Sequence, residues 1–208
     1  MSTIINTVVP LYQPKINIEG VYTPYPGYTI VSHALHPLPK SLTALVDYLS
    51  SSELEKYYSF LPRTSYHVTI NPLENVHDEH QELLREEQRK LIKYDTSSVC
   101  TAESISYRNN ILLNVQFKDD NHQFEDIIKR VRSDKLIYAN ILPKYTMSWH
   151  LALAYKYKDI KNDETQTRLD EVIRNIPEIA KFPFDIPLDQ IEICHFDDMT
   201  KFTPINVD

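Results

Sequence analysis

Two hexapeptides decide the fold of this chain: SYHVTI at residues 65–70 and SWHLAL at residues 148–153. Both run in the order serine, aromatic, histidine, apolar, small, apolar. Their β-branched, aromatic and aliphatic side chains are typical of β-strands, and the first is followed directly by an Asn-Pro dipeptide that indicates a turn. The sequence therefore predicts two similar strands from distant parts of the chain, each with a histidine near its start.

Alternation along these strands predicts which side chains share a face. Because neighbouring residues of a strand point to opposite sides, His67 and Thr69 should lie on one face of the first strand. The same parity puts Ser148, His150 and Ala152 together on the second strand. Each strand thus presents a histidine on its more polar face.

A pair of imidazoles can perform acid–base chemistry, because histidine titrates near neutral pH. One neutral ring can accept a proton from the attacking oxygen while the other, protonated, gives one to the leaving oxygen. The hydroxyl of Thr69 could then donate to a phosphate oxygen, and Ser148 is a further candidate phosphate contact beside Ala152. The repeat alone leaves a second interpretation open, in which His67 and His150 are ordinary strand histidines.

Outward from the two strands, the pattern alternates between strands and amphipathic helices. Asn109 and Asn110 predict a hairpin turn between two of the strands. The order indicates an α+β fold in which two similar halves are conceivable. The expected further strands are 28–35, 99–107, 111–117 and 188–196, and the expected helices are 41–60, 79–94, 121–137 and 164–176.

The first part of the chain lacks this periodicity. Residues 1–27 are interrupted by four prolines and end in Tyr-Pro-Gly, which favours an irregular arm that leads into a turn. We therefore expect an N-terminal arm at residues 1–27 and a single folded domain at residues 28–208.

Composition excludes several classes of function. A formal net charge of −7 argues against a protein that grips long duplex nucleic acid, which needs a basic surface. With only two glycines, the chain has neither a glycine-rich phosphate loop nor a dinucleotide-binding fingerprint. Two cysteines far apart predict no disulfide framework or zinc knuckle. No apolar run is long enough for a membrane span, so we expect a cytoplasmic protein that does not bind membranes.

Histidine pairs elsewhere in the chain raise the possibility of a metal site. His33 with His36, and His77 with His80, are each spaced i,i+3. Neither pair has a known zinc-hydrolase spacing, so the prediction is that the protein needs no metal and no other cofactor. Of the remaining histidines, His195 is expected to be structural and His122 to lie on the surface.

Four stretches resemble a known family when taken together and in order. They are YPGYTIV at residues 25–31, LPRTSYHVT at 61–69, HLALAY at 150–155 and CHFDDM at 194–199. In this combination the chain is similar to the 2H phosphoesterase superfamily, and within it to the DUF1868 branch of cyclic-phosphodiesterase-like (LigT-like) proteins. The resemblance covers about residues 20 to 205.

The resemblance implies a bilobal α+β fold, with two antiparallel sheets facing a central cleft and helices outside. It implies a monomeric, metal-independent phosphodiesterase that hydrolyses a cyclic or 2′-linked phosphodiester of a nucleotide or short RNA, with His67 and His150 as the catalytic pair. One position departs from the family pattern, which has Ser or Thr two residues after each histidine. Ala152 has no hydroxyl, so a degenerate protein that binds nucleotides or RNA ends without turnover stays an alternative.

Overall fold

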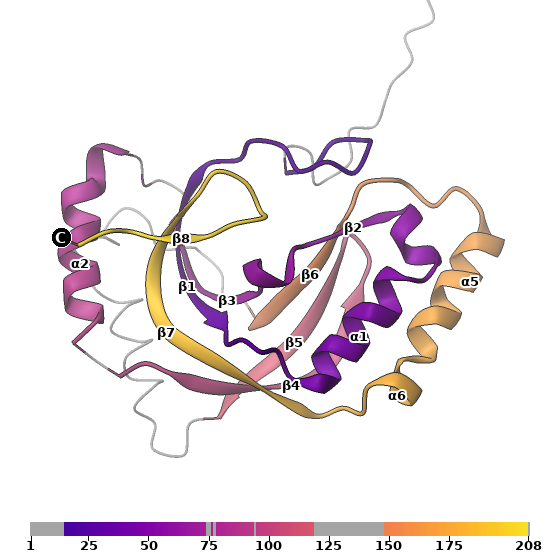
Figure 1. Cartoon of the computed structure of the whole chain (residues 1–208). Coiled ribbons are helices and arrows are strands. Elements are labelled where there is room, and N and C mark those ends of the chain that lie inside the picture. Colours follow the sequence, from indigo (N-terminus) through magenta and orange to yellow (C-terminus); the bar gives the residue numbers. More distant parts are fainter. Residues whose placement is uncertain (1–14, 74–75, 77, 94, 119–147, 208) are drawn as a thin grey trace, which may run out of the picture.

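The computed structural model describes residues 15–73, 76, 78–93, 95–118 and 148–207 (Figure 1). The helix predicted at 121–137, His77 and His122 lie outside the described residues. Within the described residues, no helix combines the length and apolar character needed to cross a membrane.

The described strands form one continuous sheet in which every pair is antiparallel. The order is β1-β3-β6-β5-β4-β7-β8, with β2 paired to β6, and an added pairing between β1 and β7 closes the sheet on itself. The strands are β1 Gly27–Ala34, β2 Tyr58–Phe60, β3 His67–Leu73, β4 Ser98–Tyr107, β5 Asn110–Lys118, β6 His150–Lys156, β7 Phe184–Phe196 and β8 Thr203–Pro204.

The long strand β7 is the reason that the sheet closes. Its first part, residues 184–188, pairs with β4, and its second part, residues 188–196, pairs with β1. The sequence prediction began this strand at residue 188 and so missed the part that reaches β4. The α+β class and the predicted hairpin of β4 and β5 are confirmed, whereas the division into two separate sheets is not confirmed.

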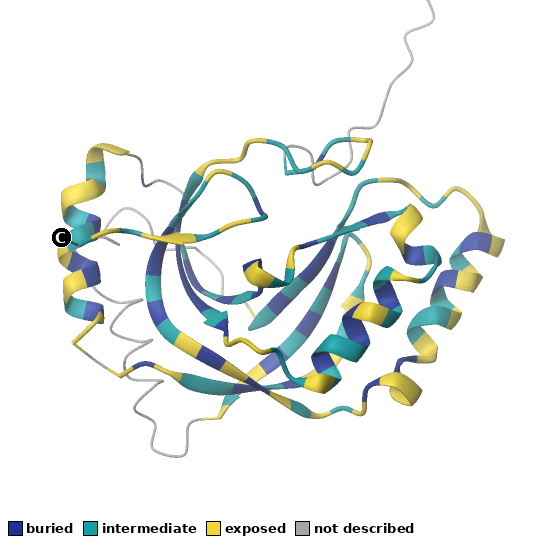
Figure 2. Cartoon of the chain, viewed as in Figure 1, coloured by how far each residue is buried: buried dark blue, intermediate teal, exposed yellow. Residues whose placement is uncertain are grey.

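Helices cover this sheet on two sides, as Figure 1 shows, with α1, α5 and α6 together on one side and α2 on the other. One face of α1 supplies four buried side chains, Leu42, Leu45, Val46 and Leu49. Figure 2 shows dark blue, buried bands along this helix. The helices are α1 Lys40–Ser50, α2 Gln81–Leu91, α5 Asp163–Arg174 and α6 Ile176–Ile179, with short 3-10 turns η1 Glu53–Lys56, η2 Arg63–Ser65 and η3 Asp78–His80.

The helix predicted at 41–60 is shorter than expected. It begins at Lys40, one residue earlier than predicted, and ends at Ser50. The hydroxyls of Ser51 and Ser52 donate to the carbonyls of Asp47 and Leu49, and such local bonds compete with further helix. The chain after η1 is free to pair as strand β2 with β6.

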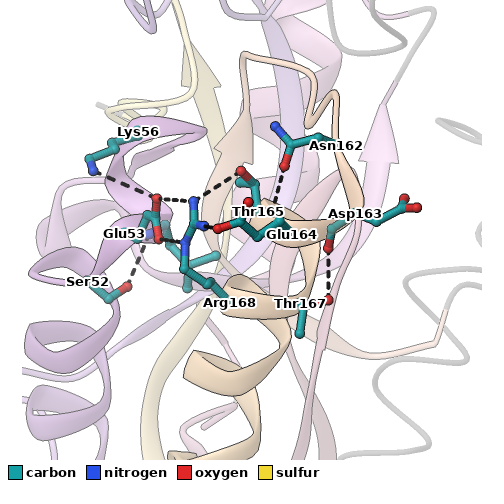
Figure 3. Close-up of polar contacts among 10 residues, drawn as sticks. Ser52, Glu53, Lys56, Asn162, Asp163, Glu164, Thr165, Thr167 and Arg168 are labelled. Carbon is teal, nitrogen blue, oxygen red and sulfur yellow. Dashed lines mark hydrogen bonds and ion pairs between the residues drawn. The ribbon is translucent and has the colours of Figure 1, made fainter.

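A cluster of polar contacts connects η1 to the start of α5 (Figure 3). Arg168 donates to both carboxylate oxygens of Glu53 and also to Glu164. Asn162 caps α5, because its side-chain oxygen accepts from the amide of Thr165 at 2.8 Å. These contacts fix α5 beside η1, on the side of the sheet that also carries α1.

Candidate active site

The two histidine strands are neighbours in the sheet. Val68 of β3 pairs with Leu151 of β6, and both side chains are 0% exposed, so they face the core. The residues on either side of them must point to the other face. Continuing the antiparallel register puts Thr69 opposite His150, and it puts His67 opposite Ala152.

We call this surface the histidine face and define it by His67, Thr69, His150 and Ala152. All four side chains are half-buried, in contrast to the buried residues between them. His67 and His150 are diagonal neighbours across the strand pair, a relation that separates backbone positions by about 7–8 Å. The structure therefore brings four of the five predicted site residues together on one face of two paired strands.

The two imidazoles are anchored in the same way. Nδ1 of His67 lies 2.7 Å from the carbonyl oxygen of Ser65, and Nδ1 of His150 lies 2.9 Å from the carbonyl oxygen of Ser148. A carbonyl oxygen can only accept, so each Nδ1 must carry the hydrogen. Each Nε2 is thereby left to accept or donate a proton, with the ring held in one orientation.

Ser148, the fifth predicted residue, lies just before β6 and is exposed. Its described contribution is the backbone carbonyl that holds His150. Ser65 plays the same part for His67, and its own hydroxyl is turned toward the carbonyl of Pro62.

His67 has close neighbours that the sequence did not reveal. His33 of β1 lies directly opposite it in the sheet, with ring centroids 5.9 Å apart, and the ring centroid of Phe202 lies 4.1 Å from that of His67. The pKa of His67 is lowered to about 4, mainly by burial. The hydrogen bond to the Ser65 carbonyl raises this pKa, and the nearby charges of His33 and His150 lower it. His67 is therefore neutral at pH 7.

On the other side of the histidine face, β5 supplies Asn114. It pairs with His150 in the sheet, and its side-chain amide donates to the hydroxyl of Ser104 on β4 at 3.0 Å. The surroundings of His150 are thus polar, whereas those of His67 are aromatic.

The N-terminal segment contributes a cation near the first histidine. The ammonium group of Lys15 lies 5.1 Å from the ring centre of Tyr25 and 5.6 Å from that of Tyr155. Its charge is one of those that lower the pKa of His67. Spacing gave no signal for Lys15, because it lies in the proline-rich segment outside any periodic element.

The structure describes most of the remaining histidines, including one of the two pairs that could have formed a metal site. His33 is half-buried within β1, whereas His36 is exposed beyond the end of that strand, so the two do not share a site. His195 follows the buried Cys194 in β7 and faces the other side of the sheet, where it packs against Tyr28 at 5.0 Å and lines a separate cavity of about 360 Å³. Because His77 is outside the described residues, its pairing with His80 is not tested.

Comparison with known proteins supports the same family. Residues 15–90 match the family 2H-phosphodiest, described as "Domain of unknown function (DUF1868)". A 66-residue segment is 41% identical to uncharacterized protein 127L of Invertebrate iridescent virus 6, over 28% of this chain and 26% of the viral protein. The chain thus matches about a quarter of the length of that relative.

Three solved structures share the fold over most of the chain. A conserved protein of unknown function from Agrobacterium tumefaciens, ATU0111, has a TM-score of 0.64 at 16% identity, over 93% of this chain and 90% of that one. TT0787 of Thermus thermophilus gives 0.53 at 11% identity, over 80% and 86% of the two chains. Escherichia coli LigT, complexed with NADP+, gives 0.53 at 9% identity, over 88% and 96%. The sequence match over residues 15–90, which includes the first histidine strand, and the fold shared with LigT both support the 2H phosphoesterase superfamily.

Proposed function

We propose that the protein is a metal-independent phosphodiesterase that hydrolyses a cyclic or 2′-linked phosphodiester of a nucleotide or short RNA. The observation that carries this proposal is the matched anchoring of His67 and His150, whose Nδ1 atoms both bond to a carbonyl two residues earlier. Two rings on one face of adjacent strands, each with Nε2 available, can address a single phosphorus atom from two directions.

In the proposed reaction, the Nε2 atom of one histidine accepts a proton from the attacking water as its oxygen bonds to phosphorus. The Nε2 atom of the other gives a proton to the leaving oxygen as the old P–O bond breaks. Thr69, opposite His150, would donate its hydroxyl hydrogen to a non-bridging oxygen, where negative charge grows in the transition state. Each step uses only protons that the two rings can hold.

Charge and relatives support a small nucleotide-like substrate. A net charge of −7 disfavours binding to long duplexes, whereas a single phosphodiester needs only a few local donors. LigT, which shares the fold, has been solved with the nucleotide NADP+. Action as a cytoplasmic monomer stays a prediction of the sequence.

The test is a substrate panel of 2′,3′-cyclic, 3′,5′-cyclic, cyclic oligonucleotide and 2′-5′-linked compounds. Wild type should hydrolyse at least one of them after exhaustive chelation, and His67→Ala and His150→Ala should each lose about 10²- to 10⁴-fold in turnover. His36→Ala, an exposed histidine outside the site, is the matched control and should keep wild-type turnover. Full activity in either site variant, or activity that disappears with the chelator, would contradict the proposal.

A second candidate is a degenerate protein that binds the same ligands without turnover. Ala152, which lies opposite His67 and lacks the hydroxyl of the family pattern, favours it. Calorimetric binding of a panel compound that wild type never hydrolyses would select this candidate over the enzyme.

A further inference from the structure

Beside the histidine face, three potential metal ligands meet on strands β1 and β7. His33 comes from β1, and Glu192 and Cys194 lie two residues apart on one face of β7. The strands are paired, with Val31 opposite Glu192, so His33 lies just beyond that pair on the same side. The ligand atoms all lie within 4.8 Å of one another.

The spacing of these atoms fits a metal ion. Nε2 of His33 lies 3.8 Å from Sγ of Cys194. In tetrahedral zinc sites, Zn–S bonds of about 2.3 Å and Zn–N bonds of about 2.0 Å put the sulfur and nitrogen about 3.5 Å apart. The two side chains are thus already close to the separation that one shared ion requires.

The donor set also selects the kind of ion. A thiolate and an imidazole favour zinc and similar transition metals, whereas magnesium and calcium prefer oxygen ligands alone. Three protein ligands of the nitrogen, oxygen and sulfur types leave the fourth tetrahedral position to water.

The carboxylate of Glu192 is the part of the cluster that a cation would stabilise most. Its carboxylate is half-buried, and among the described residues it has no hydrogen bond or ion pair. A partly buried carboxylate without a partner is costly, and a bound cation removes that cost. A thiol–imidazole contact alone would explain Cys194 and His33 but leaves Glu192 unexplained.

We propose that His33, Glu192 and Cys194 form a binding site for a divalent transition-metal ion of the zinc type. The site adjoins the histidine face, because the ring of His33 contacts that of His67, yet none of its ligands belongs to the predicted catalytic set. The proposal is independent of the phosphodiesterase activity, since metal binding is measured without substrate.

The experiment uses the full chain, reduced and stripped of metal, and titrates it with Zn²⁺ against a chromophoric chelator and with Co²⁺ by absorption. We expect one tight site per chain and a thiolate-to-cobalt charge-transfer band in the near ultraviolet. Cys194→Ser should abolish the band and weaken Zn²⁺ binding at least tenfold. Cys100→Ser, at the other buried cysteine, is the matched control and should leave both unchanged.

Glu192→Gln keeps the size of the side chain and tests the site should Cys194→Ser fail to fold. It should also weaken Zn²⁺ binding at least tenfold, with circular dichroism unchanged. The absence of stoichiometric binding by wild type, or equal binding by wild type and both ligand variants, would overturn the proposal. Either result would leave the hydrolysis assay of the two-histidine site unaffected, so the two proposals fail separately.

Discussion

Strands β3 and β6 hold their histidines by the same local device and surround them differently. In both, Nδ1 bonds to the carbonyl two residues earlier, at 2.7 Å for His67 and 2.9 Å for His150. His67 contacts the rings of both His33 and Phe202, whereas His150 pairs with Asn114 in the sheet. The strand sequence therefore sets the orientation of each ring, and the neighbouring strands and loops set its environment.

These different surroundings distinguish two histidine rings that look equivalent in the sequence motif. Burial keeps His67 neutral well below pH 7, which suits the proton acceptor of a pair. The two strands also differ in their hydroxyl groups: Thr69 lies two residues after His67, whereas Ala152, which has no hydroxyl, lies two residues after His150. Each of these differences can be altered separately by substitution.

The largest expected effect is on stability in acid. His67 has a pKa of about 4 in the folded protein and about 6.5 when unfolded. The unfolded state binds more protons between these values, so the stabilisation is complete above pH 6.5 and is lost as the pH falls toward 4. The difference corresponds to roughly 3 kcal/mol, between about two and three powers of ten in the folding equilibrium.

Urea unfolding of wild type and His67→Gln at pH 7 and at pH 4.5 measures this effect. Wild type should lose more stability than the variant over that interval, by an amount approaching the full difference. His150→Gln is the matched comparison and should keep the acid sensitivity of wild type. The same pH dependence in all three proteins would show that the surroundings of His67 do not keep it neutral.

The second effect concerns the hydroxyl of Thr69. A hydrogen bond to a charged oxygen contributes about 1.5–3 kcal/mol, so Thr69→Ala should lower kcat about ten- to a hundredfold. Thr69→Ser keeps the hydroxyl and should retain most of the activity. Equal loss in both variants would point to packing of the methyl group in place of a hydrogen bond, and steady-state kinetics on the best substrate of the panel distinguishes the outcomes.

How far the sequence predicts this molecule can be seen at the two histidine strands. Alternation in residues 65–70 and 148–153 predicts which side chains share a face, because that depends only on the local pleat of a strand. It does not predict that β3 and β6 are neighbours, which depends on contacts across more than 80 positions of sequence. Faces are local properties of a strand, whereas its partners are properties of the whole sheet.

The same limit explains the neighbours that sequence analysis missed. The i,i+3 spacing pairs His33 with His36, whereas the contacts of His33 in the structure are with β3 and β7. Phe202 lies in a stretch without periodicity, just before β8, and nothing local indicates that it covers His67. A strand prediction beginning at residue 188 likewise could not show that β7 has two successive partners.

The third effect is a gain. Ala152→Thr restores the hydroxyl of the family pattern opposite His67, and a β-branched side chain is well suited to a strand. Because Thr69 already donates to a non-bridging oxygen in the proposed site, we expect a rise in kcat of up to about tenfold, at the lower end of the energy of such a bond. Ala152→Val is nearly the same size without the hydroxyl and should give no rise. An equal rise in both variants would assign the gain to packing.

The smallest expected effect is at Ser148. Its carbonyl holds His150, and this contact survives any change of side chain, whereas its exposed hydroxyl can contribute only a weak phosphate contact. A hydrogen bond in water contributes about 0.5–1 kcal/mol net, so Ser148→Ala should lower kcat/KM about two- to fivefold. A loss as large as that of Thr69→Ala would move the phosphate-binding hydroxyl from β3 to the start of β6. The two histidine strands would then exchange their proposed roles in holding the substrate.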